Sequence, residues 1–198
     1  MNPHRVTADF EQALCEYTGS KYAVATDSCS NAIFLALKYI NVENQEISIP
    51  SHTYMSVPCQ IIHAGAKVKF QKSNPILKGA YRLVPTPIWD SALKFTKNMY
   101  IKGEYMCLSF SGPSKILKLG KGGAILTDDE RACEWFKKAR YHGRNAVAHI
   151  SDHFSMLGWN MYMPPEVAAR GLVLMAGMKE NKDVEQEYQD LSKFDIYK

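Results

Sequence analysis

Residues 105–129 read Y-M-C-L-S-F-S-G-P-S-K-I-L-K-L-G-K-G-G-A-I-L-T-D-D, and this stretch decides the fold. Its apolar runs at 105–108 and 122–126 predict two buried strands. Between them lies a loop of small and hydroxylated residues that carries Lys115. A lysine on a short loop after a buried strand is typical of an amine that forms a Schiff base rather than one that solvates a surface.

An acidic residue ends the preceding apolar run. In T-P-I-W-D-S-A, residues 86–92, two apolar residues lead directly into Asp90, so we expect this acid at the C-terminal end of a strand. Ligands of open α/β sheets bind at that edge. An acid that pairs with a pyridine nitrogen and a lysine that bonds the aldehyde of the same ring are the two protein groups that pyridoxal phosphate chemistry requires. Asp90 and Lys115 therefore predict a site for pyridoxal 5'-phosphate.

Strands and helices alternate along the rest of the chain. This order predicts an α/β fold with a mainly parallel sheet. We expect one α/β domain over residues 1–178 and a charged C-terminal tail over 179–198 that is exposed or frayed. The expected strands cover 22–25, 46–49, 67–70, 81–89, 105–110 and 122–126, and the expected helices cover 10–18, 28–40, 130–140 and 166–178. Residues 51–66 are expected to form a loop followed by a helix that ends near Gly65.

The segment at residues 22–40 predicts a phosphate site. It reads as a short strand, a turn of small residues and an apolar helix that Asp27 or Ser28 can cap. The free backbone N–H groups at such a helix start bind phosphate.

Composition narrows the class of protein. The chain has 198 residues, is 46% hydrophobic and contains no apolar run long enough to cross a bilayer. Its N-terminus lacks the apolar core of a secretory signal, so we expect a cytoplasmic protein without membrane contact. The net charge of +4 is dispersed, which favours anionic small molecules over nucleic acid. The five cysteines are scattered and form no C-x-x-C pair, so no metal site is expected.

Several motifs, read in order, resemble the DegT/DnrJ/EryC1/StrS family of sugar aminotransferases. The more specific ones are the lysine loop with its trailing G-x-G-G and the segment G-W-N-M-Y-M-P-P-E-V-A-A, residues 158–169. The resemblance runs from about residue 10 to 178. It implies the large domain of fold type I pyridoxal phosphate enzymes, a three-layer α/β sandwich, in a compact form that lacks most of the C-terminal small domain.

The resemblance also implies roles for individual residues. Lys115 would hold the cofactor as an internal aldimine and later carry a proton, and Asp90 would pair with the pyridinium nitrogen. Tyr54 would stack on the ring. The phosphate would be held by Cys29, Ser30 and Ser109, and by Asn160 of a neighbouring subunit in a homodimer with shared active sites.

The chain departs from the family pattern at three places. Cys29 and Ser30 stand where the family has glycine followed by threonine or serine, so the backbone would approach the phosphate less closely. After Asp90 the family commonly has A-A-Q, whereas this chain has S-A-L. The interval between Tyr54 and Asp90 is short for the family, which indicates that a βα unit of the sheet is trimmed.

Each of these residues also has an ordinary structural explanation. Lys115 could be a surface lysine, Asp90 a helix cap and Tyr54 a residue packed on the sheet. Ser30 and Ser109 could serve as caps or turn residues, as could Asn160. The ordered motifs favour the cofactor roles.

The leading hypothesis is a pyridoxal phosphate dependent aminotransferase of polysaccharide biosynthesis. By resemblance, it would move an amino group from glutamate or glutamine to a nucleotide-linked keto sugar. One alternative is another pyridoxal phosphate enzyme that modifies sugars; the dehydratases of this kind carry histidine in place of the lysine, so Lys115 argues against them. Another is a degenerate, non-catalytic binding module built on the same fold.

Overall fold

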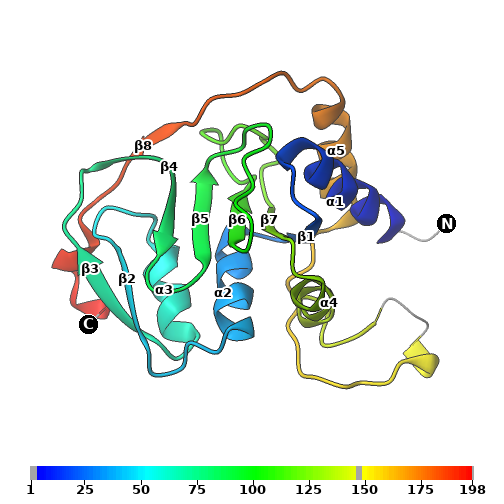
Figure 1. The fold of residues 1–198 in the computed structure, drawn as a ribbon, viewed down its shortest axis with the longest axis horizontal. Coiled ribbons are helices and arrows are strands. Elements are labelled where there is room, and N and C mark those ends of the chain that lie inside the picture. Colours follow the sequence, from blue (N-terminus) through cyan, green and yellow to red (C-terminus); the bar gives the residue numbers. More distant parts are fainter. Residues whose placement is uncertain (1–3, 146–148, 198) are drawn as a thin grey trace.

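The computed structural model describes residues 4–145 and 149–197 (Figure 1). The order of helices and strands is that of an α/β protein. In chain order they are α1 (His4–Thr18), β1 (Tyr22–Thr26), α2 (Cys29–Tyr39), β2 (Glu46–Pro50), α3 (Ser56–His63), β3 (Lys67–Gln71), β4 (Ile76–Leu83), β5 (Ile88–Leu93), β6 (Tyr105–Ser109), β7 (Gly123–Thr127), α4 (Glu130–Ala139), α5 (Pro165–Ala176) and β8 (Glu185–Glu187), with short 3-10 helices at His149–Ser151, Leu191–Lys193 and Asp195–Tyr197.

The main sheet has six strands in the order β1-β7-β6-β5-β4-β8. Within the described residues, β5 and β6 are the parallel pair of this sheet, and its other neighbours are antiparallel. The prediction of a mainly parallel sheet is therefore wrong. A short turn joins β4 to β5, and such a turn returns the chain antiparallel, whereas a parallel pair needs a long crossover. Strands β2 and β3 form a separate parallel pair.

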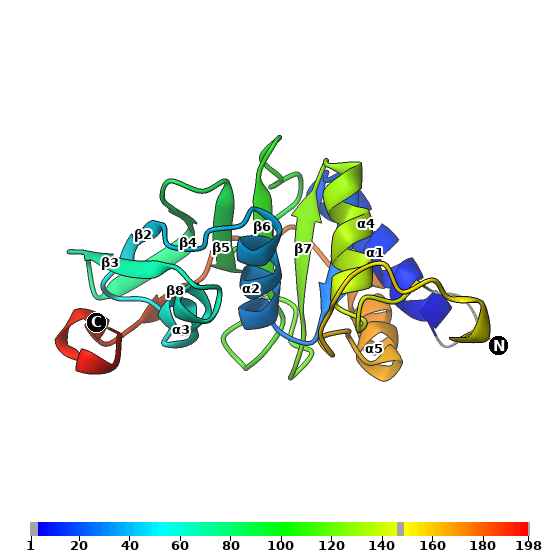
Figure 2. The same ribbon diagram turned by 90° about the horizontal axis from the view of Figure 1, so that it is seen from below.

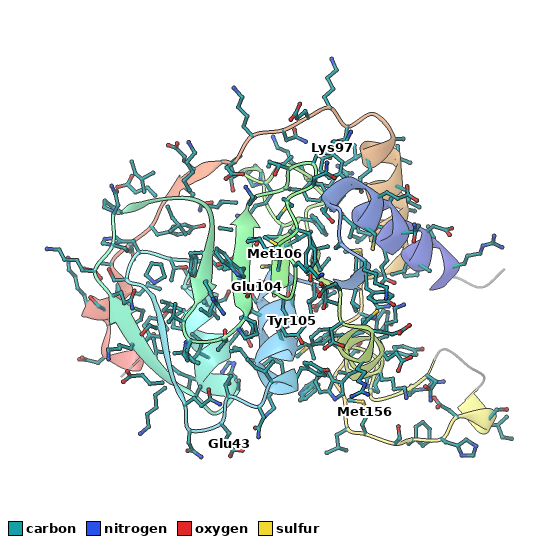
Figure 3. The ribbon with its side chains drawn as sticks, viewed as in Figure 1. Glu43, Lys97, Glu104, Tyr105, Met106 and Met156 are labelled. Carbon is teal, nitrogen blue, oxygen red and sulfur yellow. The ribbon has the colours of Figure 1, made fainter. Side chains whose placement is uncertain are left out.

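Helices cover both faces of the sheet, which confirms the three-layer α/β architecture. Neighbouring residues of β6, both labelled in Figure 3, show the division. Tyr105 packs with Phe136 of α4 in one core cluster, and Met106 belongs to the other cluster, which includes Phe10 of α1. Side chains alternate along a strand, so each strand contributes to two cores. Helices α2 and α4 run along the first face (Figure 2), whereas α1 and α5 lie together over the second.

Helix α2 begins where the sequence predicts. The Ser28 side chain caps it by accepting a hydrogen bond from the Asn31 backbone N–H at 3.2 Å, and its buried residues are Cys29 and those from Ala32 to Leu37. The start of β7 touches this cap. A Cβ at Gly123 would lie 2.4 Å from the backbone nitrogen of Cys29, so the strand reaches the helix start only because residue 123 has no side chain.

The C-terminal segment 183–197, called the strap below, crosses to the far edge of the sheet (Figure 1). Its strand β8 pairs with β4, and Leu191 and Tyr197 are buried. The prediction of an exposed tail is met at residues 192–196, but β8, Leu191 and Tyr197 are docked rather than frayed. Leu191 and Tyr197 lie in an otherwise charged stretch. Burial of their apolar surface away from water holds this stretch against the rest of the protein.

None of the helices in the described ranges has the length and apolarity that crossing a bilayer requires.

Candidate active site

A cavity of about 450 Å³ lies near the C-terminal ends of β5 and β6, beside the start of α2. Its walls bring together residues that are far apart in the sequence. Six of the residues predicted for the site line it: Cys29, Ser30, Tyr54, Asp90, Ser109 and Lys115. The seventh, Asn160, is exposed and pairs through its backbone with Tyr141, outside this cavity. A contact of Asn160 with a neighbouring subunit stays a prediction.

The acid and the amine are both buried. Asp90 is 5% exposed and Lys115 is 8% exposed, so Lys115 is not a solvated surface lysine. Burial lowers the pKa of Lys115 from its ordinary value, and the negative charge of Asp90 opposes that shift. A lysine with a lowered pKa is more often uncharged at neutral pH, which is the form that attacks a carbonyl carbon.

The carboxylate of Asp90 is held by donors on two sides. Its Oδ1 accepts a hydrogen bond of 2.9 Å from the Ala92 backbone N–H. Burial raises the pKa of Asp90, and the hydrogen bonds from Ala92 and Tyr81 and the charge of Lys115 counteract this rise. The Cys29 thiol lies 4.0 Å from the same Oδ1 and 3.4 Å from the Cys107 carbonyl oxygen. These contacts fix the orientation of the acid.

Tyr81 belongs to this site although sequence reasoning missed it. It lies opposite Asp90 in the β4–β5 register, and its hydroxyl lies 2.5 Å from that of Thr53. The signal in the sequence was weak. The alternation Gly79, Tyr81, Leu83 indicates a strand, but the partner strand is identified only once the hairpin is seen.

The phosphate end of the expected site is rich in hydroxyl groups. The first turn of α2 borders the cavity, and the Ser30 hydroxyl lies 2.6 Å from that of Ser56. The Ser109 hydroxyl accepts a hydrogen bond of 3.4 Å from the Ser111 backbone N–H. A helix start and hydroxyl donors suit an anion.

The mouth of the cavity is aromatic. Tyr54 is 49% exposed, and its ring centroid lies 6.4 Å from that of Tyr188 at an interplanar angle of 68°. Tyr188 and Gln186 come from the strap and also line the cavity. Sequence reasoning missed both because the run E-Q-E-Y-Q-D is charged and has no clear periodicity.

A second cavity, of about 400 Å³, is lined from α1 and α4 and holds none of the predicted site residues. Its arginines already have acidic partners. Arg140 is hydrogen-bonded to Glu11, and the Arg144 Nε lies 3.6 Å from an Asp152 carboxylate oxygen. The cavity beside β5 and β6 is therefore the better candidate for a catalytic site.

The sequence matches the DegT/DnrJ/EryC1/StrS aminotransferase family over residues 3–76 and 97–193. The chain belongs to this family. The part between the two matched ranges includes β5 and Asp90, so the family match covers the lysine loop but not the acid.

Known proteins are similar to this chain over much of its length. It is 39% identical to the spore coat polysaccharide biosynthesis protein SpsC of Bacillus subtilis, across 77% of this chain and 47% of that protein. It is 24% identical to the UDP-4-amino-4,6-dideoxy-N-acetyl-beta-L-altrosamine transaminase of Campylobacter jejuni, across 90% of this chain and 58% of that protein. The chain thus spans about half to three fifths of the length of these relatives.

Solved structures share the fold. PseC of Helicobacter pylori, an aminotransferase involved in the biosynthesis of pseudoaminic acid, superposes with a TM-score of 0.72 at 17% identity, over 86% of this chain and 57% of that chain. AtS13 of Actinomadura melliaura gives a TM-score of 0.74 at 19% identity, over 88% and 60% of the two chains. The trimmed large-domain architecture expected from the sequence agrees with these structures.

Proposed function

We propose that the cavity binds pyridoxal 5'-phosphate and that the protein is a sugar aminotransferase. The amino donor would be glutamate or glutamine, and the acceptor a keto sugar carried on a nucleotide. One observation carries the proposal: a buried amine with a lowered pKa, on the loop after β6, and a buried carboxylate on the adjacent strand β5 reach the same cavity. The names of the aminotransferase relatives support the reaction class.

The residues of the cavity fit this cofactor. When bound, its pyridine ring supplies an electron sink for the charge left when a proton leaves the substrate. Lys115 would bond the aldehyde carbon through Nζ with loss of water, and the same nitrogen, once the amino group of the donor displaces it, would move the proton. Asp90, removed from water, would pair with the protonated ring nitrogen, since a buried carboxylate gains most from a cationic partner.

Other residues would position the cofactor. Tyr54 would pack on the ring, and Cys29, Ser30 and Ser109 would hold the phosphate at the start of α2. Asn160 would complete the phosphate site from the partner subunit of a homodimer. The hydroxyls of Ser30 and Ser109 already take part in hydrogen bonds at the cavity wall, which keeps them oriented.

Borohydride trapping tests the cofactor site. The protein is incubated with pyridoxal phosphate, reduced and digested, and the modified peptide is identified by mass spectrometry. We expect the label on Lys115 and its loss in Lys115→Ala. Lys118→Ala is the matched control, because Lys118 is an exposed lysine on the same loop, outside the cavity. A label elsewhere, or no label, contradicts the proposal.

The reaction class needs a separate measurement. Glutamate added to the cofactor-loaded protein without any sugar should yield 2-oxoglutarate in an amount equal to the bound cofactor. Only transfer of the amino group produces this stoichiometric release. A protein that binds the cofactor and releases no keto acid from either glutamate or glutamine is instead the non-catalytic module, a candidate that the short interval between Tyr54 and Asp90 motivates.

A further inference from the structure

The strap brings a second aromatic side chain into the cavity. Tyr188 lines the cavity and lies close enough to Asp90, Cys29 and Tyr54 for their charges to raise its pKa further, beyond the effect of its burial. Tyr54 is half exposed at the mouth, and the two rings meet edge to face. We propose that Tyr188 is a cofactor-binding residue that forms, with Tyr54, an aromatic wall for the pyridine ring. This inference rests on the proposed function.

The strap is anchored before Tyr188. The Lys94 ammonium lies 3.0 Å from Asp183, and the Val184 backbone N–H donates to the Leu93 carbonyl oxygen at 2.9 Å. Strand β8 then pairs with β4, the neighbour of the strand that carries Asp90. The main chain is thereby fixed directly before the tyrosine.

The strap is also anchored at and after Tyr188. The Tyr188 backbone N–H donates to the Pro75 carbonyl oxygen at 2.9 Å, and the Leu191 N–H donates to Ser51 at 2.8 Å. Farther along, the Tyr197 hydroxyl lies 3.3 Å from the Met55 carbonyl oxygen. A ring held from both sides loses little freedom when a ligand binds, so its contacts add to affinity.

The same segment contacts the lysine loop. The Ser114 hydroxyl donates to the Gln186 Oε1 at 3.1 Å, next to Lys115 in the sequence. The strap therefore touches the cavity on the side of the amine as well as at the aromatic mouth.

Ring contact, rather than the hydroxyl, is the expected contribution of Tyr188. Aromatic pairs stabilise by an amount that corresponds to about a threefold to tenfold change in affinity. Titration of each protein with pyridoxal phosphate, followed by absorbance, measures that affinity. We expect Tyr188→Leu to bind the cofactor about threefold to tenfold more weakly and Tyr188→Phe to match the wild type.

Phe194→Leu is the matched control, because Phe194 is an exposed aromatic residue of the same strap that does not line the cavity. It should leave the affinity unchanged. Equal affinity of Tyr188→Leu and the wild type overturns the inference while the proposed function stands. A wild-type protein that binds no cofactor overturns both.

Nitration of the wild-type protein gives a test that does not depend on how a variant folds. Tetranitromethane is added with and without pyridoxal phosphate, and each tyrosine peptide is quantified by mass spectrometry. The cofactor should reduce nitration of Tyr188 and Tyr54 and leave that of Tyr22, on β1 outside the cavity, unchanged. Protection of Tyr54 without protection of Tyr188 overturns the inference.

Discussion

Tyr81 lies directly opposite Asp90 across the β4–β5 pair, and its hydroxyl links the acid to Thr53, 2.5 Å away. Residues opposite each other in an antiparallel pair point to the same face, so the hairpin itself places this phenol beside the carboxylate. The hydrogen bond from Tyr81 lowers the pKa of Asp90 against the effect of burial. The acid is thus supported by a hydroxyl that does not itself line the cavity.

Removal of this hydroxyl should raise the pKa of Asp90 further. In Tyr81→Phe the carboxylate loses a donor and Thr53 loses its partner, which costs about 1–3 kcal/mol. A group whose pKa is raised on folding contributes stability below its unfolded pKa and loses it as pH rises through the folded value. The deficit of the variant in urea unfolding should therefore grow from acidic to neutral pH. Thr53→Ala keeps the bond to Asp90 and should show a deficit that does not change with pH.

Asp90→Asn should lower the pKa of Lys115. The charge of Asp90 raises that pKa, so its removal leaves burial unopposed. Competitive acetylation of the protein over a range of pH, read by mass spectrometry of the peptides, gives the titration of each lysine. The curve of Lys115 should move to lower pH. An unmoved Lys115 curve would show that the two groups are not coupled.

Gly123→Ala should destabilise the protein by about 1–3 kcal/mol or more, because the new Cβ meets backbone that cannot rotate away. The contacts are the backbone atoms of Ser28 and Cys29 at the start of α2. Gly177→Ala is the control: a Cβ there meets nothing within 4 Å. Thermal unfolding of both variants measures the difference. Equal melting temperatures would mean that the start of α2 moves to make room for the new Cβ without a loss of stability.

Glu11→Ala should cost about 3–5 kcal/mol in urea unfolding, because it leaves the buried charge of Arg140 unpaired. Glu11 also accepts a hydrogen bond of 2.8 Å from the Ala25 backbone N–H, so one carboxylate ties α1 to β1 and to the end of α4. The exposed pair of Glu46 and Lys69 provides the comparison. Glu46→Ala should cost less than about 1 kcal/mol. Similar losses in the two variants would refute this ranking.

Local patterns predicted the elements of the site well. The strand before Lys115 and the helix capped by Ser28 depend on residues close together in the sequence, and both are present. The pairing of strands was harder to predict. Nothing in residues 76–93 shows that β4 turns back on β5, and this hairpin decides both the direction of the sheet and the place of Tyr81.

Long-range packing explains the residues that sequence reasoning missed. Tyr188 reaches the cavity because β8 pairs with a strand about a hundred residues earlier, and because Leu191 and Tyr197 are buried beyond it. In the sequence these residues stand in a charged run that is typical of a tail. Apolar residues spaced through such a run are the signal that could have indicated that the segment packs against the rest of the protein.

The direction shared by β5 and β6 has a wider consequence. Asp90 stands on β5 and Lys115 on the loop that follows β6, so the parallel pairing of these two strands brings the acid and the lysine loop to the same edge of the sheet. Strand β4, on the other side of β5, contacts the acid through Tyr81. An insertion at the β4–β5 turn should therefore leave the two groups at one edge while it displaces the hydroxyl that orients the carboxylate.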